Sequence, residues 1–121
     1  MLCKGDITSA SSHWAQGGIA AVTAVEDSFS DHVADTLDAG AGLCDEAVVN
    51  MVVEDAPKAI ARLSAWGVNF DQENNEYHLT REGGHSQRRV LHVADATGRA
   101  MTETLTNRVL DHPNIELFHD R

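Results

Sequence analysis

Residues 77–92 read YHLTREGGHSQRRVLH and place a glycine pair, Gly83-Gly84, between two short strand candidates at 77–80 and 89–93. Glycine at such a turn lets the backbone adopt a positive φ or approach a ligand closely. Three arginines surround the turn against a single acid, Glu82, in a chain whose formal net charge is −10. The pattern predicts a turn between strands that is suited to a small anion, and it leaves Glu82 to be explained.

The bulk composition excludes several classes of protein. The 121 residues fit one domain or part of one, and 42% hydrophobic with 23% charged residues is close to the soluble average. No apolar run approaches the roughly 18 residues of a membrane span, and the first residues are not a signal peptide. So acidic a chain is unsuited to nucleic acid, which requires a clustered basic face. Cys3 and Cys44 lie far apart without a CxxC motif, which argues against a disulfide framework or zinc site and favours a reducing cytoplasm.

Helical patterns alternate with widely separated strand candidates, which indicates an α/β fold. Pro57 cannot continue a helix without losing a backbone hydrogen bond, so we expect it in the first turn of a new helix. Ile60 and Leu63 should point inward from that helix, and Gly67 should end it. The expected capping residues of the four helices are Ser30, Asp45, Asp55 and Thr97.

Residues 11–22, SSHWAQGGIAAV, are small, rich in hydroxyl groups and interrupted by glycine. Such a segment offers many backbone N–H and side-chain O–H groups and little bulk, so it suits a phosphate or a flat cofactor. A flexible loop is the alternative that composition alone favours.

The two motifs together resemble the succinate dehydrogenase and fumarate reductase flavoprotein superfamily. Residues 11–22 are similar to its flavin-contacting loop, and residues 78–92 are similar to the corresponding stretch of the L-aspartate oxidase family within it. The likeness covers essentially the whole chain, with further matching segments at 31–37, 39–45, 66–68, 94–99 and 112–115. It implies that residues 1–121 are the inner segment of a Rossmann-like FAD-binding domain, helices plus short strands. The GxGxxG strand-turn-helix would lie upstream and a capping domain downstream, so we expect an incomplete domain that is inactive by itself.

The resemblance also implies which residues contact FAD. In succinate dehydrogenases a histidine bound covalently to FAD stands where this chain has Ser11, and His13 is two places away. Serine cannot form that link, so non-covalent FAD is implied. The positions carried over as FAD contacts are Lys4, Ser11, Ser12, His13, Trp14, Ala15, Gln16, Gly17 and Gly18.

Glu82 is the residue that separates the two branches of the superfamily. L-aspartate oxidases carry a glutamate at this position, whereas the dicarboxylate reductases usually carry an uncharged residue. A carboxylate gains a charge-assisted hydrogen bond from the ammonium group of aspartate and repels succinate, which has none. We therefore expect Glu82 to bind substrate, with His85 beside the glycine turn. The alternative is that Glu82 pairs with Arg81 or Arg88.

The arginines and histidines of residues 77–92 give weaker evidence of function than Glu82. Arg81, Arg88 and Arg89 suit the carboxylates of a substrate, but for each arginine taken singly pairing with acids elsewhere is the favoured explanation. His78, His85 and His92 recur every seven residues, yet a turn between strands does not hold that period on one face, so no metal site is expected. The catalytic residues of the family are expected outside residues 1–121.

The resemblance implies FAD-dependent oxidation of L-aspartate to iminoaspartate in NAD biosynthesis, with oxygen or fumarate as the electron acceptor. Two alternatives stay open. One is a succinate dehydrogenase or fumarate reductase flavoprotein, against which Ser11 and Glu82 both count. The other is a small acidic interaction module whose basic loop is incidental.

Overall fold

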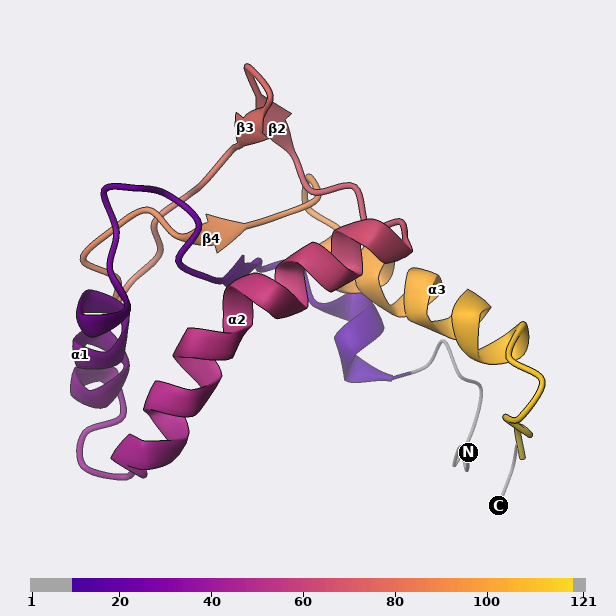
Figure 1. Cartoon of the computed structure of the whole chain (residues 1–121), viewed down its shortest axis with the longest axis horizontal. Helices are drawn as coiled ribbons and strands as arrows, with labels where there is room; N and C mark the ends of the chain where they lie inside the picture. The colour runs from indigo at the N-terminus through magenta and orange to yellow at the C-terminus, as the bar shows by residue number, and fades with distance from the viewer. Residues whose placement is uncertain (1–9, 119–121) are drawn as a thin grey trace.

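The computed structural model describes residues 10–118, which form a mixed α/β arrangement. The helix α2 runs across the middle, between α1 on one side and α3 on the other, and the β2–β3 hairpin projects above them (Figure 1). The elements in chain order are the 3₁₀ helix η2 (Ser11–Trp14), β1 (Ile19–Ala20), α1 (Phe29–Ala39), α2 (Glu46–Trp66), β2 (Gln72–Glu73), β3 (Glu76–Tyr77), β4 (Val90–Leu91) and α3 (Thr97–Leu110). The expected combination of helices and short strands is confirmed.

Two antiparallel strand pairs organise the chain between the helices. β1 pairs with β4, with Ile19 opposite Leu91, so segments about 70 residues apart are joined. β2 and β3 form a hairpin through Asn74 and Asn75, whose φ angles are 54° and 67°. Two-residue hairpin turns with positive φ at both central positions favour asparagine. Of the strand expected at 77–80, only its first residue belongs to β3, while Thr80 forms an isolated bridge with Val90.

The hydrophobic core lies where α2 covers the β1–β4 pair. Its buried members are Ala21, Ile60, Leu63, Val68, Phe70 and Leu91. Ile60 and Leu63 therefore do point inward, as their spacing predicts. Val68 and Phe70 follow α2 directly and pack into the same cluster without forming a strand.

Both ends of α2 lie at the predicted residues, whereas α1 begins at a different cap. Asp45 caps α2 by accepting a hydrogen bond from the N–H of Val48 at 3.1 Å, and Gly67 ends it with φ at 114°. The prediction of Ser30 as the cap of α1 is wrong, because Ser28 holds that position and accepts from the N–H of Asp31. Two serines of equal propensity stand there, and tertiary contacts select the first.

Pro57 does not begin a helix, which corrects the expected boundary and the expected cap at Asp55. α2 continues from Glu46 to Trp66 with Pro57 inside it. Val53 and Ile60, on either side of the proline, are both buried, so continuing the helix keeps both in the core at the loss of one backbone hydrogen bond. The helix changes direction along its length, as an internal proline requires (Figure 1).

Thr97 is the first residue of α3 rather than its cap. Its hydroxyl accepts a hydrogen bond from the N–H of Val93 at 3.1 Å, and its side chain is buried. The cap position belongs to Ala96, which supplies no side-chain hydrogen bond. Among the helices of residues 10–118, none is long and apolar enough to cross a membrane.

Candidate functional site

Residues 82–86, which we name the glycine turn, follow a segment that is hydrogen-bonded to β4. Thr80 donates its N–H to the carbonyl oxygen of Val90 at 3.0 Å, and the carbonyl oxygen of Thr80 accepts from the N–H of Arg89 at 3.1 Å. At the tip, the N–H of His85 donates to the carbonyl oxygen of Glu82 at 3.2 Å. Gly84 between them has φ at 85°, a value that glycine adopts without strain. The turn expected from the sequence is therefore present, and it carries Glu82 at its exposed end.

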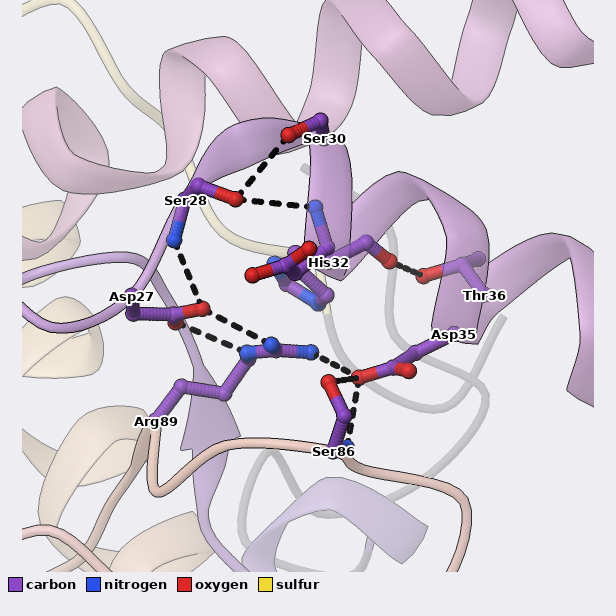
Figure 2. Close-up of polar contacts among 9 residues, drawn as sticks. Asp27, Ser28, Ser30, His32, Asp35, Thr36, Ser86 and Arg89 are labelled. Carbon is purple, nitrogen blue, oxygen red and sulfur yellow. Dashed lines mark hydrogen bonds and ion pairs between the residues drawn. The ribbon is translucent and has the colours of Figure 1, made fainter.

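A cluster of charged and polar side chains around the buried Arg89, which we name the Arg89 cluster, consists of Asp27, Asp35, Ser86 and Arg89 (Figure 2). Arg89 holds Asp27 with two hydrogen bonds of 2.8 Å, from Nε to Oδ2 and from Nη2 to Oδ1. Its Nη1 donates to Oδ2 of Asp35 at 2.5 Å. That same oxygen of Asp35 accepts the N–H of Ser86 at 2.7 Å and its hydroxyl at 2.8 Å. The cluster thus joins the segment before α1, α1 itself and the glycine turn.

The charged side chains of the cluster are shielded from solvent and hydrogen-bonded to one another. The side chain of Arg89 is 0% exposed, that of Asp27 is 2% exposed and that of Asp35 is 18% exposed. Burial alone would lower the pKa of Arg89, but hydrogen bonds and attraction from Asp27 and Asp35 outweigh it and raise that pKa. Burial likewise raises the pKa of Asp35, yet the hydrogen bonds from Ser86 and Arg89 prevail and lower it to about 2. Both partners are therefore charged at neutral pH.

Two histidines lie against this cluster. His32 is buried on α1 and is drawn beside Arg89 in Figure 2, and its ring centroid lies 6.1 Å from that of His85. Burial lowers the pKa of His32, and the charge of Arg89 lowers it further. The Nδ1 atoms of both histidines are buried and have no hydrogen-bond partner within residues 10–118. His85 therefore faces inward toward α1, whereas Glu82 on the same turn faces outward.

The three arginines of the stretch have different surroundings. Arg89 pairs with acids, so the alternative to anion binding is correct for this residue. Arg81 and Arg88 line an open hollow of about 770 Å³, together with His78 and the acids Glu26, Asp27, Glu73 and Glu76. The hollow has mixed charge, so it does not provide the simple anion site that the arginine count suggests. Within the described range, Glu82 forms no ion pair with Arg81 or Arg88.

Residues 11–18, the expected FAD contacts that we name the cofactor loop, pack against the first turns of α3. Nδ1 of His13 lies 3.2 Å from Oγ1 of Thr102, and the N–H of Gly98 donates to the carbonyl oxygen of Ala15 at 3.0 Å. A β-carbon on Gly98 would stand 2.0 Å from the carbonyl oxygen of Ser12, so only glycine permits this approach. Residues 11–14 therefore form a short helix held by tertiary contacts, whereas residues 15–18 have no regular secondary structure.

The open side of this loop has the properties that a flavin requires. Ser11, Ser12 and residues 14–18 are exposed, and Trp14 is 68% exposed. The N–H groups of Gln16 and Gly17 donate to no other residue of the range 10–118, and a β-carbon built on Gly17 would meet no atom within 4 Å. A cofactor could lie over this backbone and accept those hydrogen bonds. The expected contact Lys4 lies outside the described residues.

The cofactor loop and the glycine turn meet at β4. A β-carbon on Gly18, which ends the loop, would stand 2.2 Å from the carbonyl oxygen of Leu91 and 2.4 Å from Cγ1 of Val90. Val90 is also the residue that bridges to Thr80 at the base of the turn. One short strand therefore sets the position of both segments.

The other histidines of the stretch form a separate contact. Nδ1 of His78 lies 3.2 Å from Nε2 of His92, which in turn lies 3.5 Å from Oδ2 of Asp71. His85 is turned toward α1 and does not join them. No group of three metal-ligating side chains is found in the part of the chain that the structure describes.

A family model described as FAD binding domain matches residues 2–121. The chain belongs to the FAD binding domain family. FAD as the cofactor and the α/β fold class are thereby confirmed, while non-covalent attachment and the individual contact residues stay predictions. The match extends over nearly the whole sequence, so both motifs lie within one FAD-binding domain.

Curated relatives of this family member are L-aspartate oxidases. The chain is 50% identical over 118 residues to L-aspartate oxidase of Synechocystis sp., a match that covers 98% of this chain and 21% of that protein. It is 50% identical over 117 residues to L-aspartate oxidase of Neisseria meningitidis, covering 97% and 23%. The chain thus spans about a fifth of the length of the curated relatives it matches.

Solved structures of related flavoproteins have the same fold. Quinol fumarate reductase of E. coli matches with a TM-score of 0.94 and 32% identity, over 98% of this chain and 20% of that one. A Mycobacterium smegmatis Sdh1 complex matches with a TM-score of 0.91 and 25% identity, over 98% and 23%. The predicted resemblance to this superfamily is therefore confirmed in fold as well as in sequence.

Sequence reasoning did not find the Arg89 cluster. It identified Arg89 as one of three basic residues but not Asp27 or Asp35, which are 62 and 54 residues away from it. The one local signal was an arginine adjoining a hydrophobic pair, Val90 and Leu91, which indicates a position close to the core.

Proposed function

We propose that this chain is the inner segment of the FAD-binding domain of an FAD-dependent L-aspartate oxidase. The observation that carries the proposal is the 50% identity with L-aspartate oxidases over 98% of the chain, which includes the complete glycine turn. The proposed reaction removes two electrons and two protons from L-aspartate and gives iminoaspartate, a step of NAD biosynthesis. Bound FAD would supply the acceptor for the two electrons, with oxygen or fumarate reoxidising it.

In this proposal Glu82 recognises the ammonium group of L-aspartate. Its carboxylate is exposed and forms no ion pair with another described residue, so it is free to accept a charge-assisted hydrogen bond. The carboxylate would repel a dicarboxylate that has no amine. His85 is the second proposed substrate residue, although its inward orientation supports a role in fixing the turn.

The backbone of residues 11–18 would hold the flavin without a covalent bond. Ser11 cannot form a histidyl link, and the ring of His13 is directed to Thr102 on α3. The remaining flavin and substrate contacts, including the GxGxxG segment and the capping domain, are proposed to come from parts of the protein outside this sequence. We place the protein in the cytoplasm, in keeping with its two separated cysteines.

Substitution of Glu82 tests the proposed substrate. In the full-length flavoprotein, Glu82→Gln should raise the KM for L-aspartate and lower the preference for aspartate over succinate by about 10- to 100-fold, the loss of one charge-assisted contact. Glu54→Gln, an exposed acid on α2, is the matched control and should leave both unchanged. Unaltered discrimination in Glu82→Gln would contradict the assignment.

A fumarate reductase or succinate dehydrogenase flavoprotein is the second candidate. It is supported by the TM-score of 0.94 with quinol fumarate reductase, at the lower identity of 32%. Anaerobic mixing of the full-length flavoprotein with either L-aspartate or succinate distinguishes the two. Bleaching of the flavin absorbance by aspartate alone supports the oxidase, and bleaching by succinate alone supports the second candidate.

A further inference from the structure

Building on the proposed function, we infer that Asp35 and Arg89 are positioning residues that fix the glycine turn and so set the selectivity of Glu82 for an amine-bearing dicarboxylate. Neither residue lies on the turn's exposed face, and Arg89 is fully buried. Their effect on substrate would therefore pass through Ser86, which belongs to the turn.

The turn is attached to α1 through Asp35. Oδ2 of Asp35 accepts two hydrogen bonds from Ser86, one from the backbone and one from the hydroxyl. Two donors from one residue on one oxygen restrain both the path of the main chain and the side chain. Gly84 faces the same helix, because a β-carbon built on it would lie 3.8 Å from the β-carbon of Ala39 on α1. The turn is therefore pinned against α1 as well as at its base.

Asp35 is itself held in place by Arg89. The Nη1 atom of Arg89 lies 2.5 Å from Oδ2 of Asp35, while its Nε and Nη2 atoms each donate to Asp27. Asp27 also accepts the N–H of Ser28, the cap of α1, at 2.8 Å. A planar guanidinium with three fixed contacts has little freedom to move, so the position of Asp35 is set by two elements at once.

Glu82 is linked to this attachment through the backbone of the turn. Its carbonyl oxygen accepts from the N–H of His85, which precedes Ser86. Residues 82–86 are thus fixed at the Ser86 end by Asp35 and at the Thr80 end by the bridge to Val90. No side-chain hydrogen bond or ion pair of Glu82 with another residue of 10–118 is found, so the backbone of the turn sets the point from which its side chain reaches toward a substrate.

Displacement of the Glu82 carboxylate should reduce the selectivity for aspartate over succinate more than it reduces the turnover number. The hydrogen bond to an ammonium group and the repulsion of a second carboxylate both depend on distance. A displacement of about 1 Å is enough to change rate or binding by about 100-fold in a preorganised site. Releasing the Ser86 end should therefore weaken recognition of the amine, with a smaller effect on the turnover number at saturation.

The test uses the full-length holoenzyme with Asp35→Asn and Ser86→Ala, and Asp38→Asn as control. Asp38 is an exposed acid on the same helix, outside the cluster. Asp35→Asn should raise the KM for L-aspartate by about tenfold and lower the ratio of aspartate to succinate activity to a similar degree. Ser86→Ala, which keeps the backbone donor, should shift both in the same direction by a few-fold. The FAD content of both variants should equal that of wild type.

A double-mutant cycle with Glu82→Gln shows whether the effect passes through Glu82. In that background Asp35→Asn should change the selectivity ratio little, because the group that it positions is already neutral. Additive effects would overturn the inference, and so would unchanged selectivity in both Asp35→Asn and Ser86→Ala. If Asp35→Asn does not fold, Ser86→Ala decides alone. A wild-type protein that does not oxidise L-aspartate would instead refute the proposed function.

Discussion

Ser86 donates both its backbone N–H and its hydroxyl to one carboxylate oxygen of Asp35, at 2.7 and 2.8 Å, across 51 positions of sequence. This contact attaches a loop between two strands to a helix that precedes it in the chain. Because Arg89 binds the same oxygen, the loop, the helix and the buried cation form one unit. A change in the charge of Asp35 must therefore be felt both in stability and in the position of the turn.

Acid should weaken this unit in a defined range of pH. The pKa of Asp35 is lowered from 3.8 to about 2 in the folded protein, since the bonds from Ser86 and Arg89 outweigh burial. A lowered pKa means that the carboxylate stabilises the fold fully above about pH 4, and that this contribution disappears as pH falls through about 2. The difference in urea midpoint between wild type and Asp35→Asn should narrow across that range. A difference that stays constant from pH 5 to pH 2 would contradict the assignment.

Removal of the buried cation should be among the most damaging single changes. Arg89→Met leaves the carboxylates of Asp27 and Asp35 without their partner, which costs about 3–5 kcal/mol when a buried pair is broken. Arg89→Lys keeps the charge but loses the two-point contact with Asp27, so its effect should be intermediate. Urea denaturation of the full-length protein measures both. Arg62→Met, at an exposed position on α2, should change the free energy of unfolding by less than about 0.5 kcal/mol.

The sequence predicted those parts of the fold that depend on local chemistry. The cap of α2 at Asp45 and its end at Gly67 follow from side-chain geometry within a few residues, and both are found. Ser28 rather than Ser30 caps α1, because Asp27 is held by Arg89 and binds the N–H of Ser28 in turn. That choice depends on a contact across 62 residues, which no local pattern records.

In the candidate site, too, the sequence predicted the local features but not the contacts between distant segments. The glycine turn and the exposure of Glu82 follow from the local sequence. The assignment of Arg89 to anion binding could not be decided locally, because its partners come from the other side of the molecule. An arginine in a basic stretch and a buried structural arginine have the same signature until the distant acids are placed.

Replacement of the internal proline of α2 should stabilise the protein. Pro57→Ala would restore an N–H that can donate to the carbonyl oxygen of Val53 and would remove the clash of the ring with that group. An increase of about 1–3 kcal/mol in the free energy of unfolding is expected, because proline is about 3 kcal/mol less favourable than alanine within a helix. Thermal denaturation of the full-length variant provides the measurement. A lower midpoint would mean that the bend itself is needed to bury Val53 and Ile60.

Adjacent glycines in the cofactor loop should respond differently to the same substitution. Gly18→Ala places a methyl group 2.2 Å from the carbonyl oxygen of Leu91, a backbone atom that cannot move without opening the β1–β4 pair. We expect a loss of about 1–3 kcal/mol in stability, the usual cost of forced overpacking. Gly17→Ala meets no atom within 4 Å and should leave the stability of the apoprotein within about 0.5 kcal/mol of wild type.

The binding of FAD separates the two effects. If the flavin lies over the exposed N–H groups of Gln16 and Gly17, a methyl group on Gly17 stands between the backbone and the cofactor and should weaken FAD binding by about tenfold, or about 1.4 kcal/mol. Quenching of flavin fluorescence on titration of the full-length apoprotein gives the Kd. Ala61→Gly, on the exposed face of α2, is a control that should lower stability by about 1 kcal/mol without altering the Kd. A Gly17→Ala variant with the wild-type Kd would show that the flavin does not pass over this part of the loop.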